Sequence, residues 1–141
     1  MLIVDTTVLV YAAGREHVFR DPCFRLMSAA AAGALEVRTT VEVIQEFIHV
    51  RSRSRGREDA LVRGRAYLTL LGPLLPSEET HLRDGLAIFG ASYRLGSFDA
   101  VLAAVALAHG AVLVSADHAF AGVPSLDHVV PTQESVAALG A

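Results

Sequence analysis

The chain has 141 residues, 52% hydrophobic and 19% charged, which predicts one globular domain over residues 1–141 with a buried core. Its net charge of −3 argues against a histone-like protein that coats nucleic acid. All twelve basic residues are arginines, so lysine-dependent mechanisms such as Schiff-base chemistry are excluded. A single cysteine, Cys23, excludes an internal disulfide and indicates a reducing compartment.

No segment predicts export or membrane insertion. The N-terminal stretch MLIVDTTVLVYAAG carries an acid at Asp5 and no basic residue, which is unlike a signal peptide. The most apolar stretch, residues 100–114, is interrupted by His109 and Gly110 and is too short to span a bilayer. We therefore expect a cytoplasmic protein.

The first half of the chain alternates short apolar runs with helical patterns. Leu2-Ile3-Val4 is an apolar run that ends at Asp5 and predicts a buried strand. The pair Asp21-Pro22 is typical of a helix start, and Gly33 of a helix end. Together with Thr40 as a helix cap, these signals predict, in order, a strand over 2–4, helices over 8–13 and 21–33, a strand over 35–39, and helices over 40–53 and 58–71.

The second half predicts the remaining helices and the end of a sheet. The helix expected over 98–108, capped by Ser97, is almost wholly apolar and should be buried. The other expected elements are a very short strand at 74–75, a helix over 77–95, strands over 111–114 and 129–130, and a short C-terminal helix. Strands that alternate with helices predict a three-layer α/β/α domain with a central, mostly parallel sheet of about five short strands.

Four carboxylates stand out by their positions. Asp5 and Asp117 each follow a buried apolar strand, Glu46 lies in the middle of a helix, and Asp99 lies in the first turn of the most apolar helix. Ligands of parallel sheets bind beyond the carboxyl ends of the strands, so Asp5 and Asp117 meet there if their strands are neighbours. Gathered carboxylates repel one another unless a cation lies among them, and Mg²⁺ and Mn²⁺ prefer oxygen ligands.

Each of these carboxylates also has an ordinary structural interpretation. Asp5 could cap the next helix, Glu46 could be a solvated helix residue, Asp99 could interact with the helix dipole, and Asp117 could form an Asx turn. Other site chemistries find less support. The six histidines show no HxxxH or HxH spacing for zinc, and the chain has no GxSxG nucleophile motif.

Three segments carry a family resemblance when taken together and in order. The first is LIVDTTVLVYAAG, the second is TTVEVIQEFIHV, and the third is LGSFDAVLAAVALAHGAVLVSADHAF. They resemble the strand–Asp start, the Glu-bearing helix, and the Asp-Ala helix with its following strand and Ser-x-Asp-x-x-Phe ending of PIN-domain ribonucleases. Over essentially its full length the chain is similar to the VapC-type toxins of VapBC toxin–antitoxin pairs within that family.

The resemblance implies a metal-dependent endoribonuclease toxin that inhibits translation and growth until its antitoxin neutralises it. It implies that Mg²⁺ or Mn²⁺ is held by Asp5, Glu46, Asp99 and Asp117, with Thr7 and Ser115 as accessory residues. Glu42 lies one turn before Glu46 and competes with it for the helical position. We prefer Glu46, because an acid followed by Phe fits the family pattern better.

The resemblance also implies partners: an RNA substrate, with transfer RNA favoured, a VapB-type antitoxin, and a second copy of the chain in a homodimer. The residues themselves point to one RNA-binding segment. Arg51, Arg53 and Arg55 open an arginine-rich stretch over residues 51–65, and arginine binds phosphate well. The ordinary interpretation of that stretch is a solvated helix face.

Three other functions remain open at this point. A catalytically silent PIN-fold binding module would share the fold. A haloacid-dehalogenase-type phosphatase also begins with a strand and an Asp, but Thr7 stands where that family needs a second Asp. A receiver domain shares the architecture and an acidic site, but it needs a lysine that this chain lacks.

Overall fold

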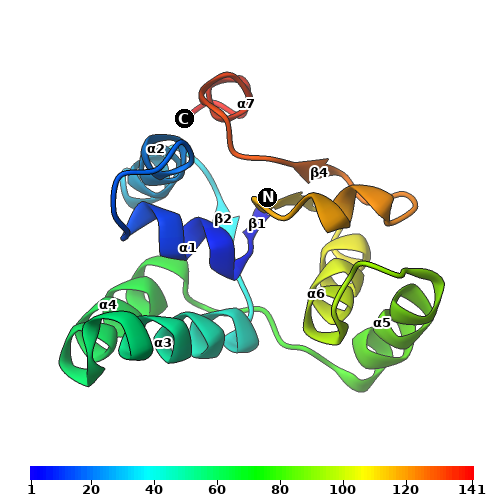
Figure 1. Ribbon diagram of the computed structural model, residues 1–141. Coiled ribbons are helices and arrows are strands. Elements are labelled where there is room, and N and C mark those ends of the chain that lie inside the picture. Colours follow the sequence, from blue (N-terminus) through cyan, green and yellow to red (C-terminus); the bar gives the residue numbers. More distant parts are fainter.

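The computed structural model describes residues 1–141 and has a parallel sheet at its centre (Figure 1). Its strands pair in the order β2-β1-β3-β4 and are β1 (Leu2–Val4), β2 (Val37–Arg38), β3 (Val112–Val114) and β4 (His128–Val129). In the central pair, Leu2 lies opposite Val112 and Val4 opposite Val114. The predicted α/β class with a parallel sheet is confirmed.

The strands are two or three residues long, and the two central ones, β1 and β3, carry most of the burial. Ile3, Val4, Leu113 and Val114 are all inaccessible to solvent, as expected for strands that are covered on both faces. The sheet has four strands rather than about five. The strand expected at 74–75 is reduced to an isolated parallel bridge between Thr40 and Leu75.

Seven helices cover the sheet, and a 3₁₀ turn, η1 (His118–Gly122), follows β3. In Figure 1, α1 to α4 lie to one side of the sheet and the α5–α6 pair to the other, with α7 beside α2. The helices are α1 (Thr6–Ala12), α2 (Arg20–Ala31), α3 (Val41–Arg55), α4 (Arg57–Leu71), α5 (Glu79–Ala91), α6 (Ser97–Ala108) and α7 (Gln133–Ala138). None of them combines the length and apolar character that a membrane-spanning helix requires.

Several helix ends differ from the sequence prediction for local reasons. Helix α2 begins at Arg20, so Asp21 lies in its first turn and Phe19 takes the cap position. Gly96 rather than Ser97 is the residue before α6. Helix α5 ends at Ala91, short of residue 95, because the Ser92 hydroxyl accepts the backbone N–H groups of Arg94 and Leu95 and closes a turn.

Gly56 separates α3 from α4 and lets the chain reverse direction. Its φ of 89° lies in the left-handed region, which side chains other than glycine rarely adopt. The two helices then pack against each other along their length (Figure 1). As a result, α3 presents one face to α4 and leaves another free beside the carboxyl edge of the sheet.

Candidate active site

Asp5 lies where the connections of the sheet change direction. From β1 the chain runs outward to β2 on one side, and from β3 to β4 on the other, so β1 and β3 flank the switch point. The backbone N–H of Asp5 donates to the carbonyl of Val114 at 3.1 Å. Asp5 is 4% exposed, and its side chain accepts the backbone N–H of Thr6 at 2.5 Å, so Asp5 also caps α1.

Two hydroxyl groups hold the Asp5 carboxylate in place. Ser115, which is fully buried after β3, donates to Oδ2 of Asp5 at 2.7 Å, and Thr7 donates to the same oxygen at 3.0 Å. Burial raises the pKa of Asp5, and the hydrogen bonds from Ser115, Thr7 and Thr6 oppose that rise. Both residues predicted as accessory therefore contact Asp5 directly.

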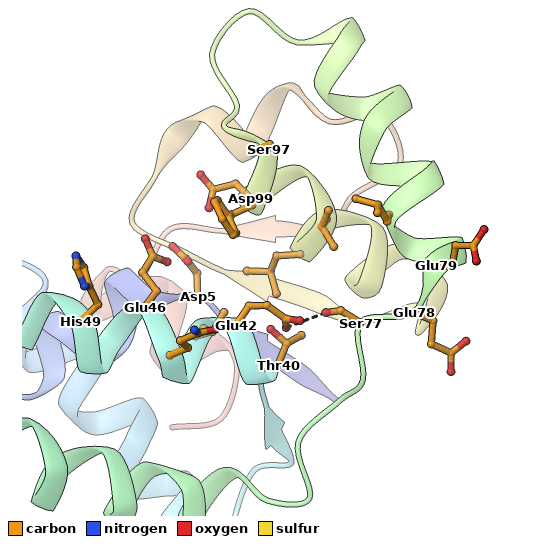
Figure 2. A pocket seen from close by; sticks show the side chains of 16 residues that line it. Asp5, Thr40, Glu42, Glu46, His49, Ser77, Glu78, Glu79, Ser97 and Asp99 are labelled. Atoms are coloured by element: carbon orange, nitrogen blue, oxygen red, sulfur yellow. Dashed lines mark hydrogen bonds between the residues drawn. The ribbon is translucent and has the colours of Figure 1, made fainter.

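Glu46 reaches the same place from α3. The hydroxyl of Thr6 donates to Oε2 of Glu46 at 2.6 Å and ties the start of α1 to α3. Sequence reasoning missed this role, because the contact depends on how α1 packs against α3. Figure 2 shows the side chains of Asp5 and Glu46 pointing toward one another, whereas Glu42 accepts a 2.8 Å hydrogen bond from Ser77 further along the groove.

Asp99 projects from the first turn of α6 across the groove from Glu46 (Figure 2). Burial, followed by the negative charges of Asp5, Glu46 and Asp117, raises the pKa of Asp99 to about 7. Its carboxylate makes no hydrogen bond to the protein. The structure therefore brings the four predicted carboxylates close enough for their charges to act on one of them.

Asp117 differs from the other three in its surroundings. It does not line the groove, and its Oδ1 accepts the backbone N–H of Ala119 at 2.8 Å, which caps η1. Its own backbone N–H donates to the hydroxyl of Ser115 at 3.0 Å. Asp117 is thus linked to Asp5 through Ser115 and also has the Asx-type role that its sequence position allowed.

The donor set of this site fits a hard divalent cation. It consists of carboxylate oxygens with no arginine among them, and Mg²⁺ and Mn²⁺ prefer such ligands. A cation there would counter both effects that raise the pKa of Asp99, which are its burial first and the neighbouring negative charges second. The structure holds no group of three or more acidic, His or Cys side chains already at ligand spacing, so binding requires side chains such as Asp99 to rotate inward.

The site opens into a groove of about 750 Å³ between α3 and the α5–α6 pair. Six carboxylates line it, no arginine does, and His49 is the one lining residue that can carry a positive charge. Its apolar wall includes Phe98, which is 79% exposed next to Asp99. The acidic lining residues are Asp5, Glu42, Glu46, Glu78, Glu79 and Asp99.

The arginine-rich segment is divided between core and surface. Arg51 is 9% exposed, forms an ion pair with Asp59 across the α3–α4 turn, and donates to the carbonyl of Ala13 at 2.9 Å. The expectation that Arg51 contacts RNA does not fit this placement, because its guanidinium is already bound within the fold. Arg53 and Arg55 are exposed and take part in none of the ion pairs.

Sequence comparison supports the family resemblance of the three sequence segments. The PIN domain family matches residues 2–126. The chain is 47% identical to Ribonuclease VapC7 of Mycobacterium tuberculosis over 141 residues, which cover 99% of this chain and 97% of that protein. It is 29% identical to Ribonuclease VapC13 of the same organism over 89% of this chain and 97% of that protein.

Solved structures share the fold. VapBC2 from Rickettsia felis, bound to a DNA fragment from its promoter, aligns with a TM-score of 0.71 at 19% identity, covering 91% of this chain and 96% of that chain. A toxin–antitoxin complex from Klebsiella pneumoniae aligns with a TM-score of 0.67 at 19% identity over 93% and 98% of the two chains. With its parallel sheet, its acidic switch point and these relatives, the chain belongs to the PIN domain family.

Proposed function

We propose that the protein is a Mg²⁺- or Mn²⁺-dependent endoribonuclease that acts as the toxin of a toxin–antitoxin pair. The observation that carries the proposal is Asp99, whose pKa is raised to about 7 by burial and by Asp5, Glu46 and Asp117. Carboxylates gathered in this way beside an open groove are suited to hold divalent cations. The 47% identity to a protein named as a ribonuclease supports the same reaction class.

In this proposal Asp5, Glu46, Asp99 and Asp117 hold the metal. Bound divalent cations supply the charge that activates a water molecule and stabilises the leaving 3′ oxygen during phosphodiester hydrolysis. Ser115 and Thr7 hold Asp5 in its ionised, correctly oriented form through their hydrogen bonds. Thr6 orients Glu46, in the way that outer hydrogen bonds orient metal ligands in general.

Analysis of the product ends tests this chemistry. We expect incubation of bulk transfer RNA with the protein and Mg²⁺ to give fragments with 5′-phosphate and 3′-hydroxyl ends, because the attacking nucleophile is water. Fragments that carry 2′,3′-cyclic phosphate would show that the RNA 2′-hydroxyl is the nucleophile, and they would contradict the proposal. Asp21→Asn, an exposed change on α2, serves as the active control.

The partners we propose are a VapB-type antitoxin and a second copy of the chain. The structural neighbours from Klebsiella pneumoniae and Rickettsia felis are toxin–antitoxin complexes, which supports an antitoxin partner. Induced expression of the chain in the cytoplasm should arrest growth, and co-expression of its antitoxin should restore it. Light scattering of the isolated protein at twice the monomer mass would support the homodimer.

A silent PIN module remains the second candidate, because no metal-ligand cluster is preformed in the structure. Measurements of Mn²⁺ binding and of RNA cleavage distinguish a nuclease from a silent module. A nuclease binds Mn²⁺ and also cleaves RNA. A silent module binds RNA or the antitoxin and cleaves no RNA at any Mn²⁺ concentration.

A further inference from the structure

One face of α3 carries a charge gradient that ends in two groups the proposed chemistry does not use. Glu42, Glu46, His49 and Arg53 follow one another at spacings of four, three and four residues, which places them in one stripe along the helix. The stripe is acidic toward the start of α3 and becomes basic toward its end. It lies along the groove, since Glu42, Glu46 and His49 all line it.

The acidic end of the groove is unfavourable for a polyanion. Glu42, Glu78 and Glu79 line that end, and Figure 2 shows them on the side of Asp5 opposite to His49. The proposed metal would reduce the negative charge of Asp5, Glu46, Asp99 and Asp117. Glu42 and Glu78 would keep their charges without a cationic partner, whereas Glu79 pairs with Arg83. An RNA strand that ran through this end would bring its phosphates against carboxylates with no arginine in the lining.

The other end offers free donors at suitable spacing. His49 is exposed, and its imidazole makes no hydrogen bond to the protein; Arg53 is exposed and forms no ion pair. Along the helix axis, His49 lies about 4.5 Å beyond Glu46 and Arg53 about 6 Å further, at about 1.5 Å per residue. The step from His49 to Arg53 leaves room for the two side chains to contact separate phosphates of one strand.

We propose that His49 and Arg53 bind the two RNA phosphates that follow one another away from the scissile bond, so that the substrate strand leaves the carboxylates along the C-terminal half of α3. The inference rests on the proposed nuclease function and adds the path of the substrate to it. His49 and Arg53 are then substrate-binding residues with no part in the chemical step. The acidic end of the groove carries no RNA.

Steady-state cleavage of bulk transfer RNA tests the path. His49→Gln and Arg53→Gln should each raise KM about fivefold to tenfold with kcat nearly unchanged, as expected for the loss of one phosphate hydrogen bond. His49→Arg should restore the wild-type KM. The controls are Arg20→Gln, which removes one positive charge on α2, and Glu79→Gln, which removes one negative charge at the acidic end; both should leave KM unchanged.

Binding gives a readout that does not depend on cleavage. In an Asp99→Asn background with Mg²⁺, the affinity for a short random-sequence RNA should depend less steeply on salt when Arg53 is replaced by Gln, by about 0.7 in the logarithmic slope. The proposed RNA path is wrong if the wild type cleaves RNA but His49→Gln and Arg53→Gln leave KM and the salt dependence unchanged. It is also wrong if Glu79→Gln lowers KM. Either result leaves the proposed nuclease function intact. A wild type that neither cleaves nor binds RNA overturns both.

Discussion

The hydroxyl of Ser115 donates a 2.7 Å hydrogen bond to Oδ2 of Asp5 and joins two residues that lie 110 positions apart in the chain. The contact exists because β1 and β3 are paired neighbours, with Val4 opposite Val114, so that the residues after both strands emerge side by side. Both side chains are buried. The bond therefore links the sheet register to the carboxylate at the centre of the candidate site.

Ser115→Ala should destabilise the protein by about 1–3 kcal/mol at neutral pH, because it leaves a buried, ionised carboxylate without one of its donors. The Ser115 hydroxyl lowers the folded-state pKa of Asp5, so its loss raises that pKa further above the ordinary value. The destabilisation is then complete above the folded pKa and shrinks as the pH falls and Asp5 becomes protonated. Urea unfolding across this pH range measures it.

Ser28→Ala is the matched control for that measurement. The Ser28 hydroxyl donates to the carbonyl of Phe24 on the exposed surface of α2, and its removal leaves no buried group without a partner. We expect a change within about 0.5 kcal/mol at every pH. An equal loss of stability in both variants would contradict the role given to Ser115.

Asp99→Asn should stabilise the metal-free protein at pH 8 while abolishing cleavage. The pKa of Asp99 is raised from 3.8 to about 7, so the folded state binds this proton more tightly than the unfolded state does. The ionised carboxyl therefore costs stability fully above about pH 7, and the cost disappears as the pH falls toward 4. We expect Tm in EDTA to rise by a few degrees at pH 8 and not at pH 4.

Asp21→Asn is the control for the loss of a helix-dipole contact, which Asp99→Asn also causes. Asp21 lies in the first turn of α2, as Asp99 does in α6, but its side chain is 70% exposed and pairs with Arg20. It should lower Tm slightly or leave it unchanged. A decrease of Tm in Asp99→Asn at pH 8 would contradict the cost assigned to the ionised Asp99 carboxylate, which is buried and lies near other negative charges.

Thr6→Val should weaken metal binding without unfolding the protein. The valine side chain has nearly the same shape, but it cannot donate to Oε2 of Glu46, so that carboxylate is no longer oriented. Loss of such an outer hydrogen bond reduces metal affinity about 10-fold to 100-fold. Isothermal titration with Mn²⁺ measures the affinity. An unchanged affinity would show that Thr6 does not orient Glu46 for metal binding.

Much of the fold and the site follows from local sequence patterns. Asp5 and Asp117 follow the two most apolar strands, and this position alone predicts that they lie at the carboxyl edge of the sheet. The Thr6–Glu46 bond was not predictable, because it depends on how α3 packs against α1. The buried state of Arg51 was not predictable either, since it depends on the reversal at Gly56 that brings Asp59 to its side.

Arg51→Ala should therefore affect stability rather than RNA affinity. The change leaves the carbonyl of Ala13 without its donor and removes the ion pair with Asp59, for an expected cost of about 2 kcal/mol in urea unfolding. The double variant Arg53→Ala/Arg55→Ala should leave stability within about 0.5 kcal/mol and flatten the salt dependence of RNA binding. If Arg51→Ala instead weakened RNA binding and left stability unchanged, Arg51 would be an RNA-binding residue, as the sequence predicted.

Metal-dependent nuclease activity is tested by cleavage of total cellular RNA with the antitoxin-free protein in Mg²⁺, Mn²⁺ or EDTA, beside Asp5→Asn and the control Glu79→Gln. We expect discrete fragments with either metal for the wild type and for Glu79→Gln. We expect no fragments in EDTA and none for Asp5→Asn, once circular dichroism has shown that this variant is folded. Cleavage that continues in EDTA, or in a folded Asp5→Asn protein, would contradict a carboxylate-held metal as the basis of the activity.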